Sequence, residues 1–306
     1  MSATQGINWL AWWQLLRAAN VFTAASNVIA GFLLVQRGWQ PVEPLLLLVL
    51  TSGLLYEAGM VLNDVCDAKL DAVERPERPI PSGRVSKRNA LRVGIALLIG
   101  GIVSGISVTW ITGQLAPSLI AVTLAATIAL YNVRAKSTRL GLLTMGLCRF
   151  LNVCLGASIS PALTTGAADA WLLAWAIFFH TYGLTRIARH EADSIDNVDL
   201  WAGSASVLMG GIWLTGLPIA SEDAAISLTA WVAICLGLLS WEIYLAYNLI
   251  SAASHGVVRQ TVGRLIMLFL VIDAAACTLA VGWAAGLAVL SMIVPMKLLA
   301  RLTPMT

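Results

Sequence analysis

Long apolar segments alternate with short polar ones along nearly the whole chain of 306 residues. A helix needs about 17 to 25 predominantly apolar residues to cross the hydrocarbon core of a bilayer. The pattern predicts an all-α bundle of transmembrane helices near residues 18–36, 44–62, 89–111, 115–131, 141–161, 169–187, 202–220, 225–249, 262–281 and 284–301. We expect a single membrane domain over residues 1–306, built from two similar halves of approximately 1–140 and 141–306.

The last two predicted spans are the least clearly separated, because only the stretch from Gly282 to Gly286 interrupts the apolar run. A single helix over 262–301 would be about 60 Å long at 1.5 Å per residue, twice the hydrocarbon thickness. Such a helix must break or leave the membrane. We therefore favour ten spans, with nine as the alternative.

The composition agrees with a membrane protein. The chain is 58% hydrophobic and 11% charged, with a mean hydropathy of +0.82, whereas a soluble domain carries about 25% charged residues. The first 20 residues lack a basic segment followed by an apolar core and a cleavage site, so we expect no removable signal peptide. The net charge of +3 is small, and we expect no nucleic-acid partner.

Lysine and arginine gather on one side of the predicted bundle, as they do in cytoplasmic loops of membrane proteins. With the N-terminus inside, the cytoplasmic segments and span ends hold nearly all of the 19 lysines and arginines, and only Arg37 lies clearly outside. This asymmetry places every long polar loop on the cytoplasmic face. We expect a bacterial cytoplasmic membrane with the site facing the cytoplasm.

The second predicted span runs into an acidic stretch, NDVCDAKLD. Asp64, Asp67 and Asp71 stand at i, i+3 and i+7, which places three carboxylates on one face of a helix. Carboxylates crowded at a membrane edge repel one another and lose hydration, so the cluster is costly unless a cation lies between them. The pattern favours a divalent metal site that holds a phosphorylated ligand over a merely solvated helix end.

A second polar stretch, TRIARHEADSIDNVD, follows the sixth predicted span on the same side. His190, Asp193 and Asn197 repeat the spacing of the first cluster, and Glu191 and Asp196 flank them. Two acidic helix ends that face each other across a cavity could hold two or more Mg²⁺ ions, which prefer carboxylate and phosphate oxygens. Such ions neutralise a diphosphate and favour its departure.

Cations accompany both clusters, and arginine can bind phosphate oxygens with two hydrogen bonds while lysine acts as a point charge. Topology alone would also place cations on this side, but it does not explain the acids beside them. The prolines and glycine of RPIPSGR predict a folded loop that could close over a site. The cations are Arg75, Arg78, Arg84, Lys136, Arg186 and Arg189.

The run NDVCDAKLD, with RPIPSGR behind it, resembles the first signature, NDxxDxxxD, of the UbiA superfamily of intramembrane prenyltransferases. YNVRAKSTRLG is similar to that family's loop between spans 4 and 5, and Arg17 and the span spacing agree up to about residue 250. ERPERPIPSGR and CRFLN are most similar to the EboC-like subgroup.

The resemblance implies a helix bundle around a central cavity that is open to lipid. It implies Mg²⁺ as cofactor and an isoprenoid diphosphate whose ionisation gives an allylic cation, which a small acceptor attacks as diphosphate is released. By position, the resemblance assigns metal or diphosphate binding to Asn63, Asp64, Asp67 and Asp71, of which the three aspartates are also expected to be catalytic. It assigns further diphosphate contacts to Arg78, Lys136 and Arg84.

The second motif departs from the family pattern, which is usually DxxDxxxD or DxxxD. Only Asp193 is kept as an acid, because His190 and Asn197 occupy the other two places. Glu191 or Asp196 could substitute if the helix turns slightly. We expect Glu191, Asp193 and Asn197 as the metal ligands of this motif, with Asp193 also catalytic, while the metal count and the acceptor stay open.

Glu57 lies seven residues before Asp64, hence two turns deeper on the same helix face. An ionisable residue inside a span is a functional candidate, and Glu57 could contact substrate or act as a base near the acceptor. A protonated acid that is hydrogen-bonded between helices is the alternative.

Prenyl transfer from an isoprenoid diphosphate to a small acceptor is the leading functional hypothesis. One alternative is intramolecular cyclisation of the prenyl diphosphate, in which no acceptor is used. Another is a non-catalytic isoprenoid-diphosphate binder or carrier, which the altered second motif would favour.

Overall fold

The chain forms helices joined by short turns, and no strand occurs among the residues that the structure describes. The computed structural model describes residues 8–136, 138, 140–160, 168–191, 194–217 and 224–302. The helices, in chain order, are α1 (Trp9–Leu16), η1 (Ala18–Asn20), α2 (Val21–Gln36), α3 (Val42–Glu74), α4 (Lys87–Thr112), α5 (Ala116–Leu130), η2 (Tyr131–Ala135), α6 (Leu140–Ala157), α7 (Ala168–Ala188), η4 (Arg189–Glu191), α8 (Asn197–Thr215), α10 (Leu228–Ser251), α11 (His255–Val281), α12 (Trp283–Leu290) and α13 (Ile293–Leu302).

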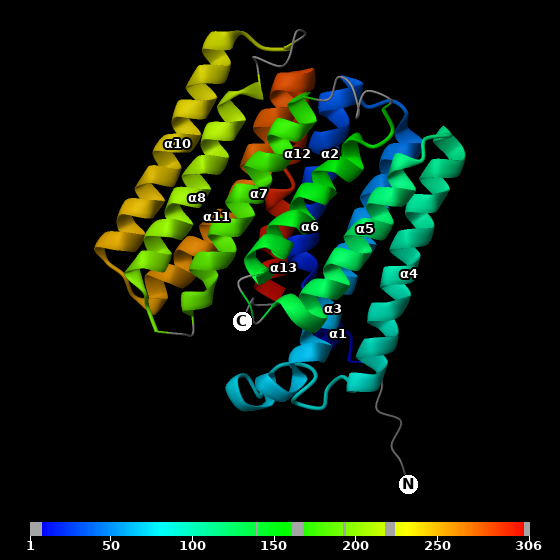
Figure 1. The fold of residues 1–306 in the computed structure, drawn as a ribbon, viewed down its shortest axis with the longest axis vertical. Coiled ribbons are helices and arrows are strands. Elements are labelled where there is room, and N and C mark those ends of the chain that lie inside the picture. Colours follow the sequence, from blue (N-terminus) through cyan, green and yellow to red (C-terminus); the bar gives the residue numbers. More distant parts are fainter. Residues whose placement is uncertain are drawn as a thin grey trace.

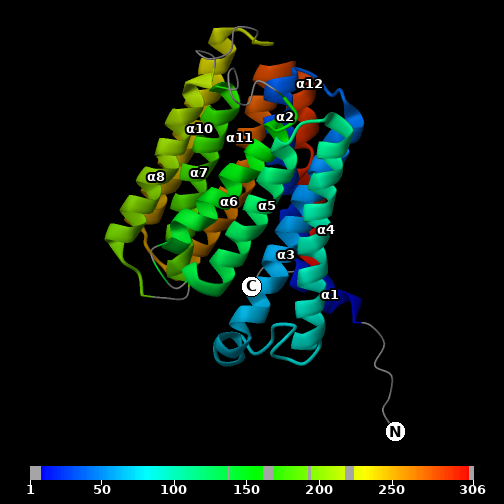
Figure 2. The same ribbon diagram turned by 45° about the vertical axis from the view of Figure 1, so that its right-hand side comes forward.

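The helices form one bundle, with α4 along one edge and α8 and α10 along the other (Figures 1 and 2). Each predicted membrane segment coincides with a helix or with two consecutive helices. Within the described ranges, eight helical segments are long and apolar enough to span a membrane. The other two predicted spans are α7 and α8, of 21 and 19 residues. The all-α membrane fold is confirmed, and the crossing of the bilayer by all ten segments stays a prediction.

The last apolar run breaks at Gly282, as expected. Gly282 has a φ of +109°, in a region that residues with a side chain rarely adopt, so α11 ends there. The chain then returns along α11, because a Cβ added to Gly286 would lie 1.8 Å from the Thr278 hydroxyl oxygen. The predicted break therefore separates α11 from α12, and no helix runs unbroken over 262–301.

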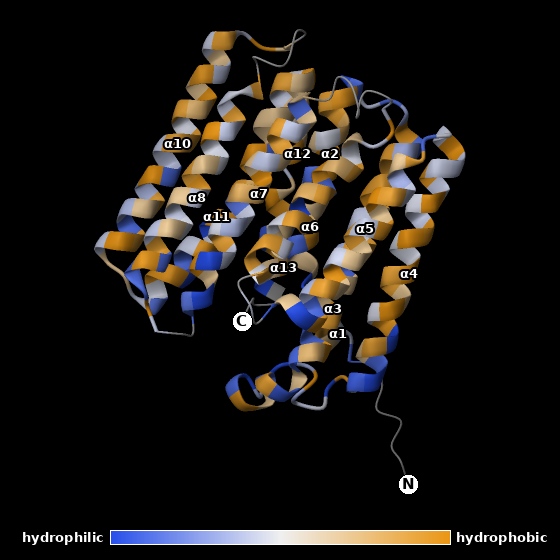
Figure 3. Ribbon diagram, viewed as in Figure 1, coloured by the Kyte–Doolittle hydropathy of each residue, from blue (hydrophilic) through white to orange (hydrophobic). Residues whose placement is uncertain are grey.

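Helix α3 is much longer than the second predicted span. Its 33 residues extend over about 50 Å, against about 30 Å of hydrocarbon. Its final turns project beyond the bundle beside α1 (Figures 1 and 2), where hydrophilic residues gather (Figure 3). The acidic stretch thus continues an apolar helix without interruption and is carried out to the end of the bundle.

Helices α2 and α6 cross at very short range in the middle of the bundle. A Cβ on Gly31 would lie 2.2 Å from the Val153 carbonyl oxygen, and one on Gly156 would lie 2.0 Å from the Val28 carbonyl oxygen. Small residues at such a crossing let the two backbones touch. Since α2 also packs on α3, α7 and α11, this crossing sets the position of α6 relative to the rest of the bundle.

Replacing Gly156 with alanine should destabilise the protein, because the added methyl group meets backbone that cannot move without separating α2 from α6. Overpacking of this kind costs about 1–3 kcal/mol. We expect a lower midpoint of thermal unfolding in detergent, measured by tryptophan fluorescence. Gly237→Ala in α10 is the matched control, since nothing lies within 4 Å of its added methyl group; equal midpoints for the two variants would contradict the close crossing.

Candidate active site

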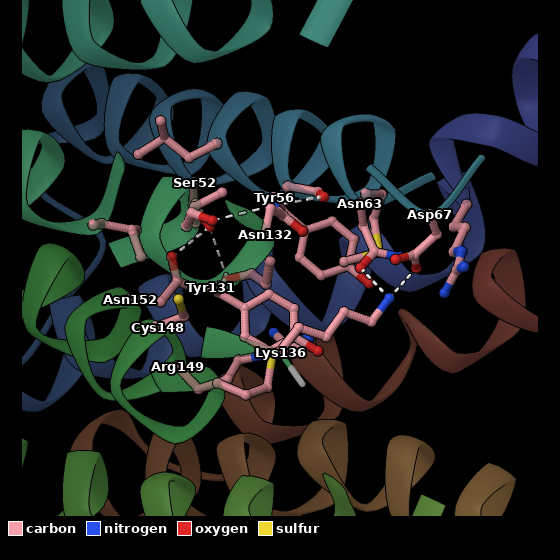
Figure 4. Close-up of a pocket in the computed structure, with 18 of the residues that line it drawn as sticks. Ser52, Tyr56, Asn63, Asp67, Tyr131, Asn132, Lys136, Cys148, Arg149 and Asn152 are labelled. Atoms are coloured by element: carbon pink, nitrogen blue, oxygen red, sulfur yellow. Dashed lines mark hydrogen bonds and ion pairs between the residues drawn. The ribbon is translucent and has the colours of Figure 1, made fainter. Parts of the chain in front are cut away.

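A cavity of about 310 Å³ lies among α3, α5, η2 and α6 (Figure 4). Helix α3 lines it with Ser52, Tyr56, Asn63 and Asp67, whose spacing places them on one helix face. From Ser52 to Asp67 the helix rises about 22 Å, so the cavity reaches from the projecting end of α3 deep into the bundle. Its apolar wall is formed mainly by Leu55, Leu124, Ile128 and Met145.

Two carboxylates of the first motif are buried against arginines. Arg78 Nη1 lies 3.0 and 2.9 Å from the two carboxylate oxygens of Asp71 and 3.7 Å from Asp64 Oδ1. Arg17 Nη2 donates to Asp64 Oδ1 at 3.3 Å. Asp64 and Asp71 are only 5% and 2% exposed, so these ion pairs offset part of the cost of taking the two carboxylates out of water.

The third carboxylate, Asp67, faces the cavity and contacts Lys136. The Lys136 ammonium also donates to Asn63 Oδ1 at 2.8 Å, so one cation joins both cavity-lining residues of the motif (Figure 4). The predicted face of three aspartates is therefore divided in the structure. Asn63 and Asp67 line the cavity, while Asp64 and Asp71 lie on the neighbouring face of α3 with Arg17 and Arg78.

A turn of π-helix, η2, brings Lys136 to this place. The Lys136 N–H donates to the Tyr131 carbonyl oxygen at 3.1 Å, a bond between residues five apart. Such turns are rare, and those that occur are often found at functional sites. Tyr131 and Asn132 line the cavity from the same turn, and the Asn132 amide donates to the Gly59 carbonyl oxygen of α3 at 3.4 Å.

Glu191, from the second polar stretch, lines the same cavity. Arg75, which directly follows α3, lines it as well. Burial raises the pKa of the Glu191 carboxyl, against the attraction of Arg259, Arg75 and Arg17. A partly buried acid that faces cations across a cavity is well placed to bind a further cation or to remain protonated. The two acidic stretches thus meet through Glu191 on one side and Asp67 on the other.

The neighbours of Glu191 turn away from the cavity. His190 is buried, with its Nδ1 at 2.7 Å from the Ser194 carbonyl oxygen and its Nε2 at 3.3 Å from Asp199 Oδ2. Arg186 binds the same Asp199 through Nε at 2.9 Å and Nη2 at 2.5 Å. Arg186 and His190 therefore stabilise the turn between α7 and α8 through Asp199.

The remaining predicted residues lie outside the cavity lining or outside the described residues. Asn197 is exposed at the start of α8, and Arg189 donates to the Thr138 carbonyl oxygen at 3.1 Å. Exposed Arg84 donates to Gln14 Oε1 at 2.8 Å and so ties the RPIPSGR loop to α1. The catalytic and metal-binding roles predicted for Asp193 fall outside the described residues.

Glu57 lies on α3 without lining the cavity. Its buried Oε2 has no hydrogen-bond partner in the described part of the chain. The structure therefore does not bring Glu57 to Asn63 and Asp67, and its predicted substrate contact stays a prediction.

Several residues that line the cavity deep in the bundle are not among the predicted site residues, including Tyr56, Arg149 and Asn152. Arg149 and Asn152 are three residues apart in an apolar span, which places them on one helix face. An ionisable residue within a span is by itself a functional signal. That signal could have identified Arg149, whereas Tyr56 carries none in the sequence.

The cavity-lining oxygens fit Mg²⁺ shared with a substrate. Asn63, Asp67 and Glu191 offer carboxylate and amide oxygens at the polar end of the cavity. No three His, Cys, Asp or Glu side chains of the described residues form a group that could hold a metal. Mg²⁺ commonly binds one or two carboxylates plus substrate phosphates and keeps several waters, so this donor set suits a metal that a diphosphate helps to hold.

Known proteins resemble the chain over most of its length. Digeranylgeranylglyceryl phosphate synthase from Sulfolobus acidocaldarius is 26% identical over 249 residues, covering 78% of this chain and 86% of that protein. 4-Hydroxybenzoate octaprenyltransferase from Idiomarina loihiensis is 26% identical over 261 residues, covering 82% and 88%. A match to the digeranylgeranylglyceryl phosphate synthase of Saccharolobus solfataricus is 43% identical over 89 residues and spans only 32% of that protein.

Solved structures share the fold. A UbiA homologue from Archaeoglobus fulgidus bound to GPP and Mg²⁺ gives a TM-score of 0.65 at 15% identity, covering 92% of this chain and 99% of that chain. An apo UbiA homologue from Aeropyrum pernix gives 0.66 at 18% identity, covering 83% and 96%. The sequence model of the UbiA prenyltransferase family matches residues 24–199. Because this match covers more than half of the chain, the protein belongs to the UbiA prenyltransferase family.

Proposed function

We propose that the protein catalyses Mg²⁺-dependent transfer of a prenyl group from an isoprenoid diphosphate to a small acceptor, with release of diphosphate. The observation that carries this proposal is a single cavity with two different ends. Carboxylates and cations lie at the end near Asp67, and mainly apolar side chains form the wall from there into the bundle, where Arg149 and Asn152 also line the cavity. An isoprenoid diphosphate likewise has a charged diphosphate group at one end of a long hydrocarbon chain.

The polar end would bind the diphosphate. Asn63, Asp67 and Glu191, with Asp193 proposed from the sequence pattern alone, would hold Mg²⁺. When bound, Mg²⁺ neutralises the diphosphate and stabilises it as a leaving group. Lys136 is paired with Asp67, so we propose that it leaves the carboxylate and binds a phosphate oxygen when the donor enters.

Arginines around the same end would complete the diphosphate site. Arg75 and Arg78 line the cavity and can bind phosphate oxygens with paired hydrogen bonds. Asp64 and Asp71 would act by positioning Arg17 and Arg78, which they bind. The proposed roles of Arg84, Arg186, Arg189, Asn197 and Glu57 rest on the sequence pattern, since these residues lie outside the cavity lining.

The reaction needs little covalent chemistry from the protein. The bond between the prenyl carbon and the diphosphate oxygen breaks, and its electron pair leaves with the diphosphate. The aromatic rings of Tyr131, and of Tyr56 two turns before Asn63 on α3, line the cavity and can stabilise an allylic cation through their π faces. The acceptor forms the new bond to the prenyl carbon and loses a proton.

The relatives support the proposed substrate class, and the apolar helices support the membrane setting. Similar proteins are named digeranylgeranylglyceryl phosphate synthase and 4-hydroxybenzoate octaprenyltransferase. A homologue of the same fold was solved with GPP and Mg²⁺. The apolar helices make the protein an integral membrane protein. We propose that the polar end of the cavity faces the cytoplasm of a bacterial cell, because lysine and arginine gather there.

Asp67→Asn should lower Mg²⁺-dependent pyrophosphate release from geranylgeranyl diphosphate by about 10- to 100-fold, since it removes the carboxylate that faces the cavity. EDTA should abolish release by the unchanged protein. Release is measured with purified protein in nanodiscs, to which a lipid extract is added as the source of acceptor.

Glu43→Gln is the matched control for Asp67→Asn, because it removes an exposed carboxylate at the opposite end of the same helix. It should retain full release. Donor binding without any release by the unchanged protein would leave only the carrier function. Release of a cyclic product without an acceptor would indicate a cyclase.

Lys136→Gln should weaken donor binding about 10-fold or more, because a charge-assisted hydrogen bond to phosphate is worth about 1.5–3 kcal/mol. The dissociation constant of a non-hydrolysable isoprenoid thiolodiphosphate measures this effect. Arg134→Gln removes an exposed cation from the same π-helical turn and should change the constant less than twofold. Similar losses in the two variants would mean that only the overall positive charge attracts the donor.

A further inference from the structure

A groove of about 380 Å³ lies between α10 and α11. Helix α10 lines it with Gly237, Leu238 and Trp241, and α11 lines it with Arg264 and Val271 among others. None of the residues that line this groove lines the cavity of the candidate active site. The groove is therefore a separate candidate binding site, which the proposed function does not use.

The groove opens on the outside of the bundle. Gly237 is exposed, and no atom lies within 4 Å of a Cβ added to it. Trp241, which follows four residues later on the same face of α10, is 53% exposed. Helix α10 lies at the edge of the bundle (Figure 1) and is apolar enough to span a membrane. The groove therefore faces the hydrocarbon chains of lipids.

One end of the groove is charged and the other is apolar. Trp241 lies ten residues before the end of α10, and Arg264 lies nine residues after the start of α11. Both residues are therefore about 14 Å from the turn that joins the two helices. The groove continues from Arg264 to Val271, about 10 Å further from this turn. Among the described residues that line the groove, Arg264 alone carries a charge.

Arg264 is a cation without a protein partner. In the described part of the chain it makes no hydrogen bond and no ion pair within 4.0 Å. The carboxylates of α10 and α11 both point inward. Glu242 is 2% exposed, and a Cβ added to Gly211 of α8 would clash with its Oε2. Asp273 is fully buried and accepts a hydrogen bond from the Asn27 amide of α2 at 2.8 Å. Neither acid therefore pairs with Arg264.

The position of Arg264 favours contact with lipid head groups. A cation inside a membrane span is costly unless an anion or water reaches it. The side chains of a helix lean toward its N-terminus, and near the start of α11 Arg259 attracts Glu191 at the polar end of the cavity. The Arg264 guanidinium can therefore extend along α11 toward the membrane surface, while the apolar part of the groove stays in the hydrocarbon.

We propose that this groove binds an anionic phospholipid, with the lipid phosphate on Arg264 and one acyl chain along Gly237 and Val271. A guanidinium can bind phosphate oxygens with paired hydrogen bonds, and the net charge of the lipid neutralises a cation that the protein leaves unpaired. A second copy of the chain fits the groove less well, because the same face of that copy offers no carboxylate from α10 or α11. The site goes beyond the proposed function and does not depend on it.

Native mass spectrometry of the purified full chain in detergent tests the proposal by measuring the dissociation constant of the first bound lipid. The lipids are phosphatidylglycerol, which is anionic, and phosphatidylcholine, which is zwitterionic, with identical acyl chains. Neither Mg²⁺ nor an isoprenoid diphosphate is added. Arg264→Gln removes the cation, and Gly237→Leu places a side chain in the groove.

Each variant has a matched control. Arg88→Gln removes an exposed cation from α4, at the opposite edge of the bundle. Ser240→Leu adds a side chain of the same size as Gly237→Leu to an exposed position of α10 that does not line the groove.

We expect the unchanged protein to bind phosphatidylglycerol about fivefold more tightly than phosphatidylcholine, which is the effect of one basic residue on an anionic lipid. Arg264→Gln should reduce this preference to less than twofold. Gly237→Leu should weaken the binding of phosphatidylglycerol at least about fivefold, because the acyl chain loses its place. Both controls should stay within twofold of the unchanged protein.

Four results would overturn the assignment: equal binding of the two lipids by the unchanged protein, a preference that survives Arg264→Gln, an equal loss in Arg88→Gln, or unchanged binding in Gly237→Leu. A dimer that forms without lipid and is lost in Gly237→Leu would show instead that a second copy occupies the groove. If Arg264→Gln does not yield folded protein, the comparison of Gly237→Leu with Ser240→Leu decides the question.

Discussion

The pairing of the carboxylates at the end of α3 with cations from other segments is the interaction on which the site depends. Arg17 comes from the turn after α1, Arg78 from the loop after α3, and Lys136 from the π-helical turn after α5. Two of the three carboxylates are almost fully buried, where an unpaired charge would be strongly unfavourable. These ion pairs therefore bring three distant segments together around one helix end.

The rest of the bundle turns this helix end into a cavity. The close crossing of α2 and α6 fixes the wall that carries Arg149 and Asn152 opposite the face of α3 that carries Tyr56 and Asn63. The polar end and the apolar wall then belong to one continuous space. In the proposed reaction, the charges that stabilise the free protein exchange partners with the diphosphate, so much of the binding site exists before the donor arrives.

The sequence predicted the helices and their break at Gly282 because apolar runs and a glycine report directly on local structure. It also indicated Lys136 and Glu191 as neighbours of the acidic motif. Periodicity gives the face that a residue occupies on its own helix, but not how that helix is rotated against its neighbours. For this reason the sequence could not show that Asn197 lies outside the cavity lining, or that Tyr56 and Arg149 meet within the cavity.

In the proposed reaction, donor and metal take the place of the internal ion pairs at the end of α3. A structure of the protein with a non-hydrolysable isoprenoid thiolodiphosphate and Mn²⁺, which can be located by its anomalous scattering, tests it most directly. We expect the metal to lie between Asp67 and Glu191 and the Lys136 ammonium to bind a phosphate oxygen. A diphosphate bound elsewhere, with Lys136 still on Asp67, would contradict it.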